Sequence, residues 1–153
     1  MNFVDALLGN YMFVASVASW LAAQVLKTAI EAYFNKEINW ERMTGSGGMP
    51  SSHSSTVCAL ATAAAIQYGL ESPYFAICFV LASVVMYDAT GVRQETGKQA
   101  KILNKILVDN PFNWKDEEFE KKLKEYVGHT PLQVLAGAIL GICIAFLVAG
   151  NYR

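Results

Sequence analysis

The sequence predicts an all-α membrane protein, a polytopic helical bundle of about four transmembrane helices with amphipathic and soluble helices on its cytoplasmic side. Hydrophobic residues make up 54% of the 153 residues, and the mean hydropathy of +0.28 is high for a soluble chain of this length. These residues gather in four nearly charge-free stretches that polar segments separate. The length suits one domain, so we expect residues 1–153 to form a single membrane-embedded unit.

The four apolar stretches comprise residues 11–26, 56–70, 74–87 and 132–149. Each is somewhat shorter than the roughly 20 residues of a spanning helix, but a polar flank such as Gln24 can extend a span inside a bundle. No long polar face runs along any of them. This favours membrane spans over the alternative, a soluble bundle with an unusually apolar core.

The distribution of charge predicts the sidedness of the protein. With four spans, the connections 27–55 and 88–131 lie on one side of the membrane, and both termini and the 71–73 turn lie on the other. Of the twelve Lys and Arg residues, all except Arg153 fall on the first side. By the positive-inside rule this side is cytoplasmic. We therefore expect an integral protein of the plasma (inner) membrane with its long connection 88–131 in the cytoplasm.

The long connection carries two expected helices. Residues 90–109 place apolar side chains at helical spacing, with three lysines on the remaining face: Lys98, Lys101 and Lys105. This helix suits the lipid headgroup zone or, equally, a position capping the bundle. Residues 115–126 predict a second, charged and solvated helix. In the last span Gly137 and Gly141 allow close helix contact, which we interpret as intramolecular packing; no oligomeric state follows from them.

Polar residues concentrate in three blocks on the predicted cytoplasmic side, and the first of them precedes the second span. Gly47 and Gly48 allow a backbone to approach an anion closely. Ser51, Ser52 and His53 supply hydrogen-bonding groups near the start of a helix, where phosphate is favoured. A Gly/Ser-rich loop is also a common way to begin any helix. The block is a candidate phosphate-binding loop.

The second block follows the third span and contains Asp88 and Arg93. Ionisable groups at this position are costly unless they pair with each other or bind a ligand. One interpretation is that the two charges neutralise each other. The other is an arginine fork that contacts phosphate oxygens and that the Asp88 carboxylate holds in place.

The third block opens the last span with His129, so both histidines of the chain begin a spanning helix from the same side. A lone histidine there is usually a cap or an interfacial residue. This chain instead combines two histidines with three cations, those of Lys27, Arg42 and Arg93. These are the groups that metal-free phosphoryl transfer to water requires: cations, a nucleophile and a general acid.

Three segments carry a resemblance to a known family: 47–53 (GGMPSSH), 85–93 (VMYDATGVR) and 128–134 (GHTPLQV). In this order they resemble the divergent PAP2 family, small membrane proteins related to acid phosphatases and vanadium-dependent haloperoxidases. The similarity runs from about Asn10 to the C-terminus.

The resemblance implies roles for individual residues. Segment 50–53 is similar to the superfamily's Pro-Ser-Gly-His motif, which makes His53 the general acid that protonates the leaving oxygen. His129 is similar to the nucleophile that attacks phosphorus and forms a phosphohistidine. Arg93 corresponds to the arginine of that motif, and Lys27 and Arg42 are the candidates for the lysine–arginine motif.

The chain departs from the superfamily pattern in two ways. Arg93 is far in sequence from His129, so their meeting depends on the fold of the intervening segment. Four residues after the nucleophile, Gln133 replaces the usual aspartate; it can orient an imidazole but cannot stabilise an imidazolium. Asp88 and Glu125 are the carboxylates that can take the place of that aspartate.

These observations predict an integral-membrane phosphatase that acts on a lipid phosphate monoester at the headgroup level. The resemblance and the absence of a convincing ligand set imply no metal and no cofactor, and the expected partners are a phosphorylated lipid and the membrane, not nucleic acid. The alternative is a non-catalytic membrane protein that binds a phosphorylated lipid or a partner protein in the same pocket. A transporter is disfavoured because no charged residue lies in the middle of a span.

Overall fold

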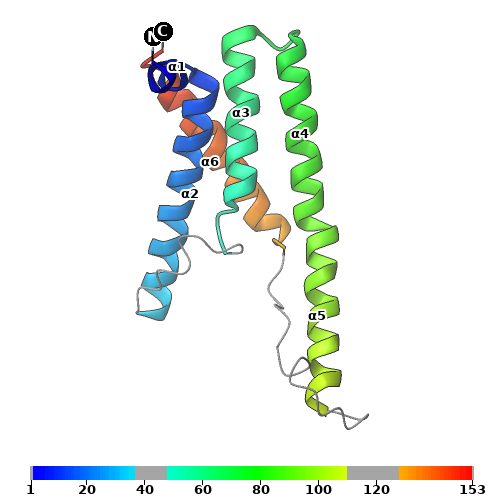
Figure 1. Ribbon diagram of the computed structural model, residues 1–153. Helices are drawn as coiled ribbons and strands as arrows, with labels where there is room; N and C mark the ends of the chain where they lie inside the picture. The colour runs from blue at the N-terminus through cyan, green and yellow to red at the C-terminus, as the bar shows by residue number, and fades with distance from the viewer. Residues whose placement is uncertain (1, 37–47, 110–127, 153) are drawn as a thin grey trace.

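The computed structural model describes residues 2–36, 48–109 and 128–152, and the regular secondary structure in these ranges is entirely helical. The helices are α1 (Phe3–Leu8), α2 (Tyr11–Asn35), α3 (Ser52–Tyr68), α4 (Pro73–Thr90), α5 (Val92–Asp109) and α6 (Pro131–Ala149). Helices α2, α3, α4 and α6 form a bundle, and the two chain termini lie together at one end of it (Figure 1). The other end carries the starts of α3 and α6.

Three helical segments of the described chain are long and apolar enough to cross a membrane: Tyr11–Asn35, Pro73–Ile106 and Pro131–Ala149. The remaining expected span corresponds to α3, which has 17 residues. Helix α3 packs against α2, α4 and α6 and is the central helix of the bundle. It is rich in Ala and Ser because most of its surface contacts protein, so its lower hydropathy fits its position.

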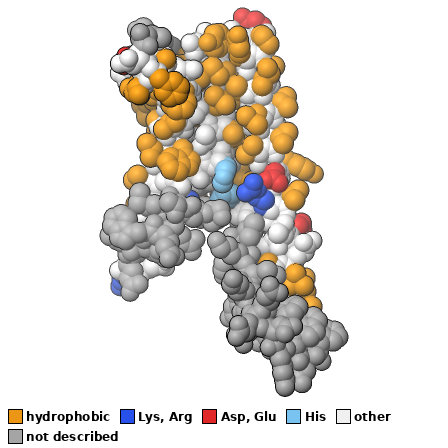
Figure 2. Space-filling model, viewed as in Figure 1, with side chains coloured by type: hydrophobic (Ala, Val, Ile, Leu, Met, Phe, Trp, Pro, Cys, Tyr) orange, Lys and Arg blue, Asp and Glu red, His pale blue; other side chains and the backbone are white. Residues whose placement is uncertain are grey.

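The bundle has small residues inside and large apolar residues outside. One core cluster consists of Tyr11, Ala15, Ala59, Ala63, Ala145 and Ala149. Large side chains such as Ile77, Val80 and Phe146 are exposed, and Figure 2 shows such side chains covering the upper part of the visible face. A soluble bundle would bury these side chains, so the soluble alternative is wrong. The protein is an all-α membrane bundle.

Close approach of α3 and α6 depends on two glycines. A Cβ atom on Gly137 would collide with the carbonyl oxygen of Ser51, and one on Gly141 would collide with that of Ser55. Ser55 also joins α3 to α2, because its hydroxyl lies 2.6 Å from the Ser19 hydroxyl and both side chains are buried. The interpretation of Gly137 and Gly141 as intramolecular packing residues is confirmed.

Helix α2 is longer than the apolar stretch that predicts it. It continues to Asn35, and Lys36 then adopts a left-handed conformation with φ of 57°. Lys27 therefore lies within α2, not in the connection that follows the span, and its side chain is only 2% exposed. The reason is that residues 27–35 contain neither Gly nor Pro and continue the helix beyond the apolar stretch.

Helix α5 continues in nearly the direction of α4 beyond the end of the bundle (Figure 1). Only Gly91 separates the two helices, so the chain does not turn back. The amphipathic helix expected over residues 90–109 is present as α5, and of the two positions that the sequence left open for it, the lipid headgroup zone or a cap on the bundle, the structure does not show the cap. Ala100 and Asn104 are buried on it, whereas Leu103 is half exposed. The charged helix expected over residues 115–126 lies outside the described residues.

Candidate functional site

The entrance of α3 is tied to the entrance of α6. Ser51 caps α3, and its hydroxyl accepts hydrogen bonds from the Ser54 N–H at 3.4 Å and from the Ser54 hydroxyl at 3.0 Å. The Ser51 N–H donates to the Gln133 carbonyl oxygen at 3.1 Å. His53, in the first turn of α3, has an exposed side chain. Backbone pairing between the two helix entrances thus places His53 beside α6.

The entrance of α6 is fixed by a capping box. The Thr130 N–H donates to Gln133 Oε1 at 3.1 Å, and the Gln133 N–H donates to Thr130 Oγ1 at 3.4 Å. His129 precedes this cap, and its N–H donates to the Ala89 carbonyl oxygen at the end of α4 at 3.0 Å. The side chain of His129 is 5% exposed. Its position is therefore set by both α4 and α6.

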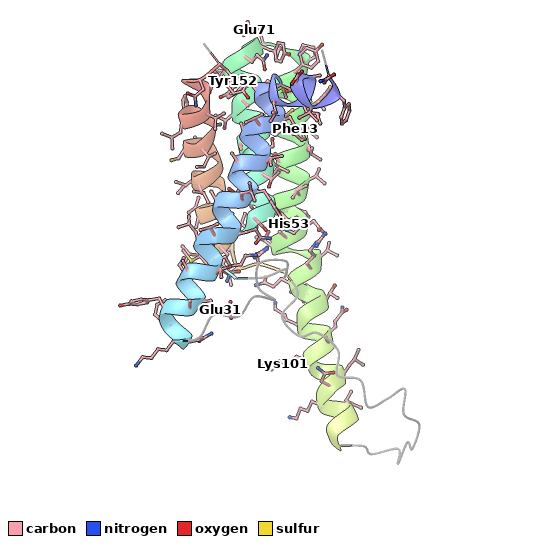
Figure 3. The ribbon with its side chains drawn as sticks, turned by 60° about the vertical axis from the view of Figure 1, so that its left-hand side comes forward. Phe13, Glu31, His53, Glu71, Lys101 and Tyr152 are labelled. Carbon is pink, nitrogen blue, oxygen red and sulfur yellow. The ribbon has the colours of Figure 1, made fainter. Side chains whose placement is uncertain are left out.

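The two histidines lie side by side. Their ring centroids are 6.4 Å apart and the ring planes are inclined by 57°. Figure 3 shows His53 away from the bundle end that carries Glu71 and Tyr152. In Figure 2 histidine, basic and acidic side chains meet at the lower border of the apolar surface. The two imidazoles therefore lie at the end of the bundle where the apolar surface stops.

Two cations surround the imidazoles. Lys27 from α2 and Arg93 from α5 both act electrostatically on His53 and on His129. Asp88 at the end of α4 accepts a hydrogen bond from Arg93 Nε at 2.5 Å. Within the described ranges, it is the one carboxylate that acts on either imidazole. Positive groups thus exceed negative ones, and the cluster is suited to an anion.

Burial lowers the pKa of His129 from its ordinary value of 6.5, and the positive charges of Lys27 and Arg93 and the nearby His53 lower it further. A hydrogen bond with Gln133 acts in the opposite direction, because His129 Nδ1 lies 3.3 Å from Gln133 Oε1. In the tautomer with a proton on Nδ1, this nitrogen donates to Gln133 and leaves the Nε2 lone pair available. At neutral pH His129 is therefore an uncharged imidazole, the form that acts as a nucleophile.

The structure separates the expected phosphate-binding residues into two groups. Lys27 and Arg93 lie close enough to act electrostatically on the imidazoles, whereas the hydroxyl of Ser51 is engaged in capping α3. Gly48 has φ of +86°, and a Cβ atom there would lie 2.9 Å from Lys27 Cδ, so this glycine makes room for the Lys27 stem. Ser52 is buried at the start of α3. Three expected residues lie outside the described ranges: Arg42, Gly47 and Glu125.

One polar residue near the two histidines, Gln24, has a buried position that its spacing in the sequence does not reveal. Gln24 lies one helical turn before Lys27 on α2 and is 5% exposed. Its Oε1 atom is buried and has no hydrogen-bond partner in the part of the chain that the structure describes. Buried acceptors are usually satisfied, so this oxygen is an additional candidate contact for a ligand or water. From the sequence Gln24 is only a polar flank of a span, since its burial depends on how α2 packs.

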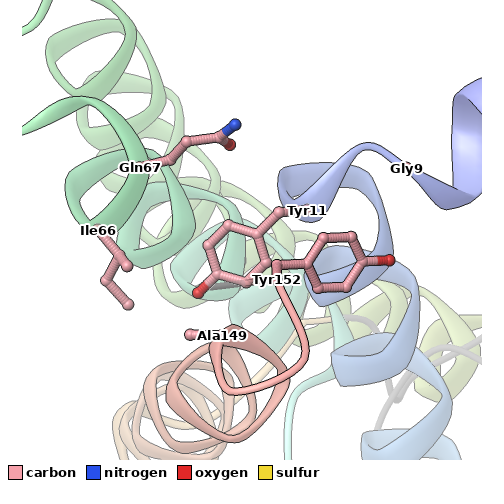
Figure 4. A pocket seen from close by; sticks show the side chains of 6 residues that line it. All are labelled: Gly9, Tyr11, Ile66, Gln67, Ala149 and Tyr152. Atoms are coloured by element: carbon pink, nitrogen blue, oxygen red, sulfur yellow. The ribbon is translucent and has the colours of Figure 1, made fainter.

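Other regions of the described chain have fewer groups that could bind a phosphate. In the described ranges no three His, Cys, Asp or Glu side chains form a group that can hold a metal ion. A cavity of about 340 Å³ lies at the bundle end that carries the termini (Figure 4). The hydroxyl groups of Tyr11 and Tyr152 there donate to the carbonyl oxygens of Ala145 and Leu8. Among the described residues no Lys or Arg lines this cavity, so the histidine cluster remains the candidate site.

The fold and the cluster define a class: integral membrane proteins built as an all-α bundle with two histidines side by side at one end of it. Comparison with known proteins identifies the family. The chain belongs to the Divergent PAP2 family, whose model matches residues 8–144. It is 40% identical over 152 residues to the uncharacterized membrane protein YuiD of Bacillus subtilis (strain 168), covering 94% of this chain and 96% of that protein. No solved structure matches the chain.

Proposed function

We propose that this protein is an integral-membrane phosphatase that hydrolyses a lipid phosphate monoester through a phosphohistidine intermediate. The observation that carries the proposal is the meeting of His53 and His129, with ring centroids 6.4 Å apart, beside two cations that act on both rings. Membership of a PAP2-type family supports it further. The proposed site faces the cytoplasm, since all Lys and Arg residues except Arg153 belong to the segments 27–55 and 88–131, which contain both histidines.

In the proposed reaction, His129 Nε2 attacks phosphorus while the bond from phosphorus to the ester oxygen breaks. His53, in its protonated form, gives its proton to the departing alkoxide. Water then attacks the phosphohistidine, His53 takes a proton from that water, and inorganic phosphate leaves. A nucleophile at about 3–3.5 Å and an acid within about 3 Å of the leaving oxygen require rings separated by several ångströms, not stacked. The centroid distance is compatible with this arrangement.

The cations supply the electrostatic part of the proposed mechanism. Arg93 and Lys27 stabilise the charge on the equatorial oxygens of the phosphoryl group. The Asp88 carboxylate binds Arg93 Nε, which leaves the two terminal nitrogens of the guanidinium for phosphate. Lys27 approaches from the buried side and Arg93 from the exposed side.

A lipid is the proposed substrate because of where the cluster lies. From Tyr11 to Lys27, α2 rises about 24 Å at about 1.5 Å per residue, which approaches the roughly 30 Å of a bilayer's hydrocarbon core. The phosphate would then sit at headgroup level while the acyl or prenyl chain stays in the bilayer.

The test is phosphate release from a panel of lipid phosphate monoesters by the purified protein in nanodiscs. We expect turnover by the wild type and a loss of about 10²–10⁴-fold in His53→Ala, with a loss at least as large in His129→Ala. Arg93→Ala should lose about 10²–10³-fold. Glu71→Ala, at the opposite end of the bundle, is the control and should retain full activity. Acid quenching should trap labelled phosphate on wild-type protein but not on His129→Ala.

The second candidate function is a non-catalytic lipid-phosphate binder, and Gln133 is the observation that favours it. An amide contacts His129 Nδ1 at the position where a carboxylate would stabilise the imidazolium. If the wild type binds lipid phosphate without releasing phosphate, and Arg93→Ala abolishes that binding, the protein is a binder and the phosphatase proposal is wrong.

A further inference from the structure

The chain entering α6 is in direct contact with the junction between α4 and α5. Gly128 has φ of +96°, in the left-handed region that other L-residues rarely adopt. A Cβ atom on it would lie 2.5 Å from the backbone nitrogen of Gln94 and 2.7 Å from the carbonyl carbon of Arg93. One residue later, the His129 N–H binds the Ala89 carbonyl oxygen. The backbone on either side of the α4–α5 junction is therefore held against the two residues that precede the α6 cap.

We propose that Gly128 is a positioning residue of the phosphate site, because its bare backbone lets His129 take a fixed place beside the guanidinium of Arg93. The inference rests on the proposed function for the identity of the anion. Arg93 and His129 are 36 positions apart in the sequence; Arg93 lies in α5, whereas His129 precedes the cap of α6. No shared helix sets their relative position, so backbone contact at Gly128 does so.

The geometry leaves little tolerance at this contact. Both atoms that a Cβ would meet belong to backbone, which cannot rotate away as a flexible side chain can. A methyl group must therefore push the chain before α6 away from Arg93 and weaken the bond from His129 to Ala89. Misplacement of a reacting group by about 1 Å can cost on the order of 10²-fold in rate.

The displacement has a signature that general destabilisation lacks. The groups that act on the His129 imidazole are Gln133, His53, Lys27 and Arg93. When His129 moves outward, its imidazole regains water and lies farther from Arg93, so the pKa of His129 rises. His53 lies on α3, which packs directly against α2, α4 and α6, so its placement depends less on Gly128 than that of His129, the next residue in the chain.

The experiment compares Gly128→Ala with the wild type and with Gly150→Ala in nanodiscs. Gly150 is the matched control, because its φ is −59° and a Cβ atom there would lie 3.7 Å from the nearest atom. NMR titration of the two imidazoles and binding of inorganic phosphate are measured. In Gly128→Ala we expect the pKa of His129 to rise, the His53 titration to stay near the wild-type curve, and phosphate affinity to fall on the order of 10-fold or more.

A wild-type titration curve and phosphate affinity in Gly128→Ala would overturn the proposal, and so would equal shifts of both histidines. If Gly128→Ala does not fold, amide exchange in the wild type decides: the His129 amide should be as protected as the hydrogen-bonded amides of α6, and fast exchange overturns the proposal. These measurements do not require the protein to hydrolyse a phosphate ester. Absence of phosphatase activity in the wild type would therefore defeat the proposed function but leave this test intact.

Discussion

At the scale of the residue, the chemistry of the site depends on the environment of His129. Its side chain is buried, its Nδ1 faces the Gln133 amide, and Lys27 and Arg93 lie nearby. Each of these except the hydrogen bond disfavours the imidazolium. The residue is therefore suited to nucleophilic attack, and it receives little help in carrying the positive charge of a phosphohistidine.

The lowered pKa of His129 predicts the pH dependence of the reaction. Attack requires the neutral imidazole, so kcat/KM should fall on acidification, when His129 gains a proton. Because its pKa lies below 6.5 in the folded protein, the midpoint of this acid limb should also lie below pH 6.5. A pH profile of kcat/KM with a soluble short-chain lipid phosphate measures it. An acid limb centred above pH 7 would contradict this prediction.

Replacing Gln133 by Glu should restore a carboxylate next to the imidazole. A negative charge at Oε1 favours the imidazolium, so Gln133→Glu should raise the pKa of His129 and move the acid limb of the pH profile to higher pH. Maximal turnover should increase, because the carboxylate stabilises the phosphohistidine. Gln133→Leu is the paired control and should lower the pKa of His129, since it removes the hydrogen bond. NMR titration of the ring measures both shifts, and identical curves for the two variants would exclude this role for Gln133.

The Gln24 side-chain oxygen, which has no hydrogen-bond partner among the described residues, predicts a stabilising substitution. A buried acceptor without a hydrogen bond costs about 1–3 kcal/mol, and Met fills a similar volume without that cost. Gln24→Met should therefore raise the free energy of unfolding of the ligand-free protein by about 1 kcal/mol. Denaturant unfolding in mixed micelles measures it, with Gln67→Met at an exposed glutamine as the control. A loss of stability in Gln24→Met would show that the oxygen already has a partner.

At the scale of the element, close backbone approach between α3 and α6 holds the two helix entrances together. The Ser51 N–H binds the Gln133 carbonyl oxygen, and the glycines of α6 face carbonyl oxygens of α3. Because His53 and His129 belong to these entrances, the separation of their rings depends on this helix contact.

Enlarging Gly141 tests that contact. Its Cβ would collide with the Ser55 carbonyl oxygen and lie 3.0 Å from the Ala59 nitrogen, both of which are backbone atoms. Gly141→Ala should destabilise the protein by about 1–3 kcal/mol and reduce phosphate binding as the helix entrances separate. Gly150→Ala, which has room for a Cβ, should be neutral in the same unfolding assay. Wild-type stability in Gly141→Ala would mean that α3 and α6 pack less closely than the structure indicates.

At the scale of the whole molecule, the two histidines lie at one end of the bundle. The termini, Glu71 and the tyrosine-lined cavity lie at the other end (Figures 3 and 4). All Lys and Arg residues except Arg153 belong to the segments 27–55 and 88–131, which also contain both histidines. The candidate site and the basic segments of the sequence therefore coincide.

This asymmetry predicts the orientation of the protein in the membrane. In a Cys143→Ser background, an impermeant thiol reagent added to intact cells should label Glu71→Cys but not Lys101→Cys. Permeabilised cells should label both, which controls for reactivity. Labelling of Lys101→Cys alone in intact cells would invert the orientation and place the histidines on the outer surface.

Much of this architecture follows from the sequence. The all-α membrane fold, the approximate spans and the start of both histidine helices on one side depend on local composition and charge, which hydropathy and helix signals report directly. The same signals misplace Lys27, because α2 continues past its apolar stretch. They also allow a bundle-capping position for the amphipathic helix, although α5 continues the line of α4. Helix boundaries and directions depend on packing that composition does not encode.

By itself, the sequence determined the class of protein and its family resemblance, and it supplied the list of candidate site residues. Only the tertiary structure decided that His53 and His129 lie together beside Lys27 and Arg93, and that Gln24 is buried with no partner for its Oε1 atom among the described residues. The physical reason is that these contacts join residues distant in sequence. They depend on backbone approaches at Gly128, Gly137 and Gly141 whose partners no local pattern specifies.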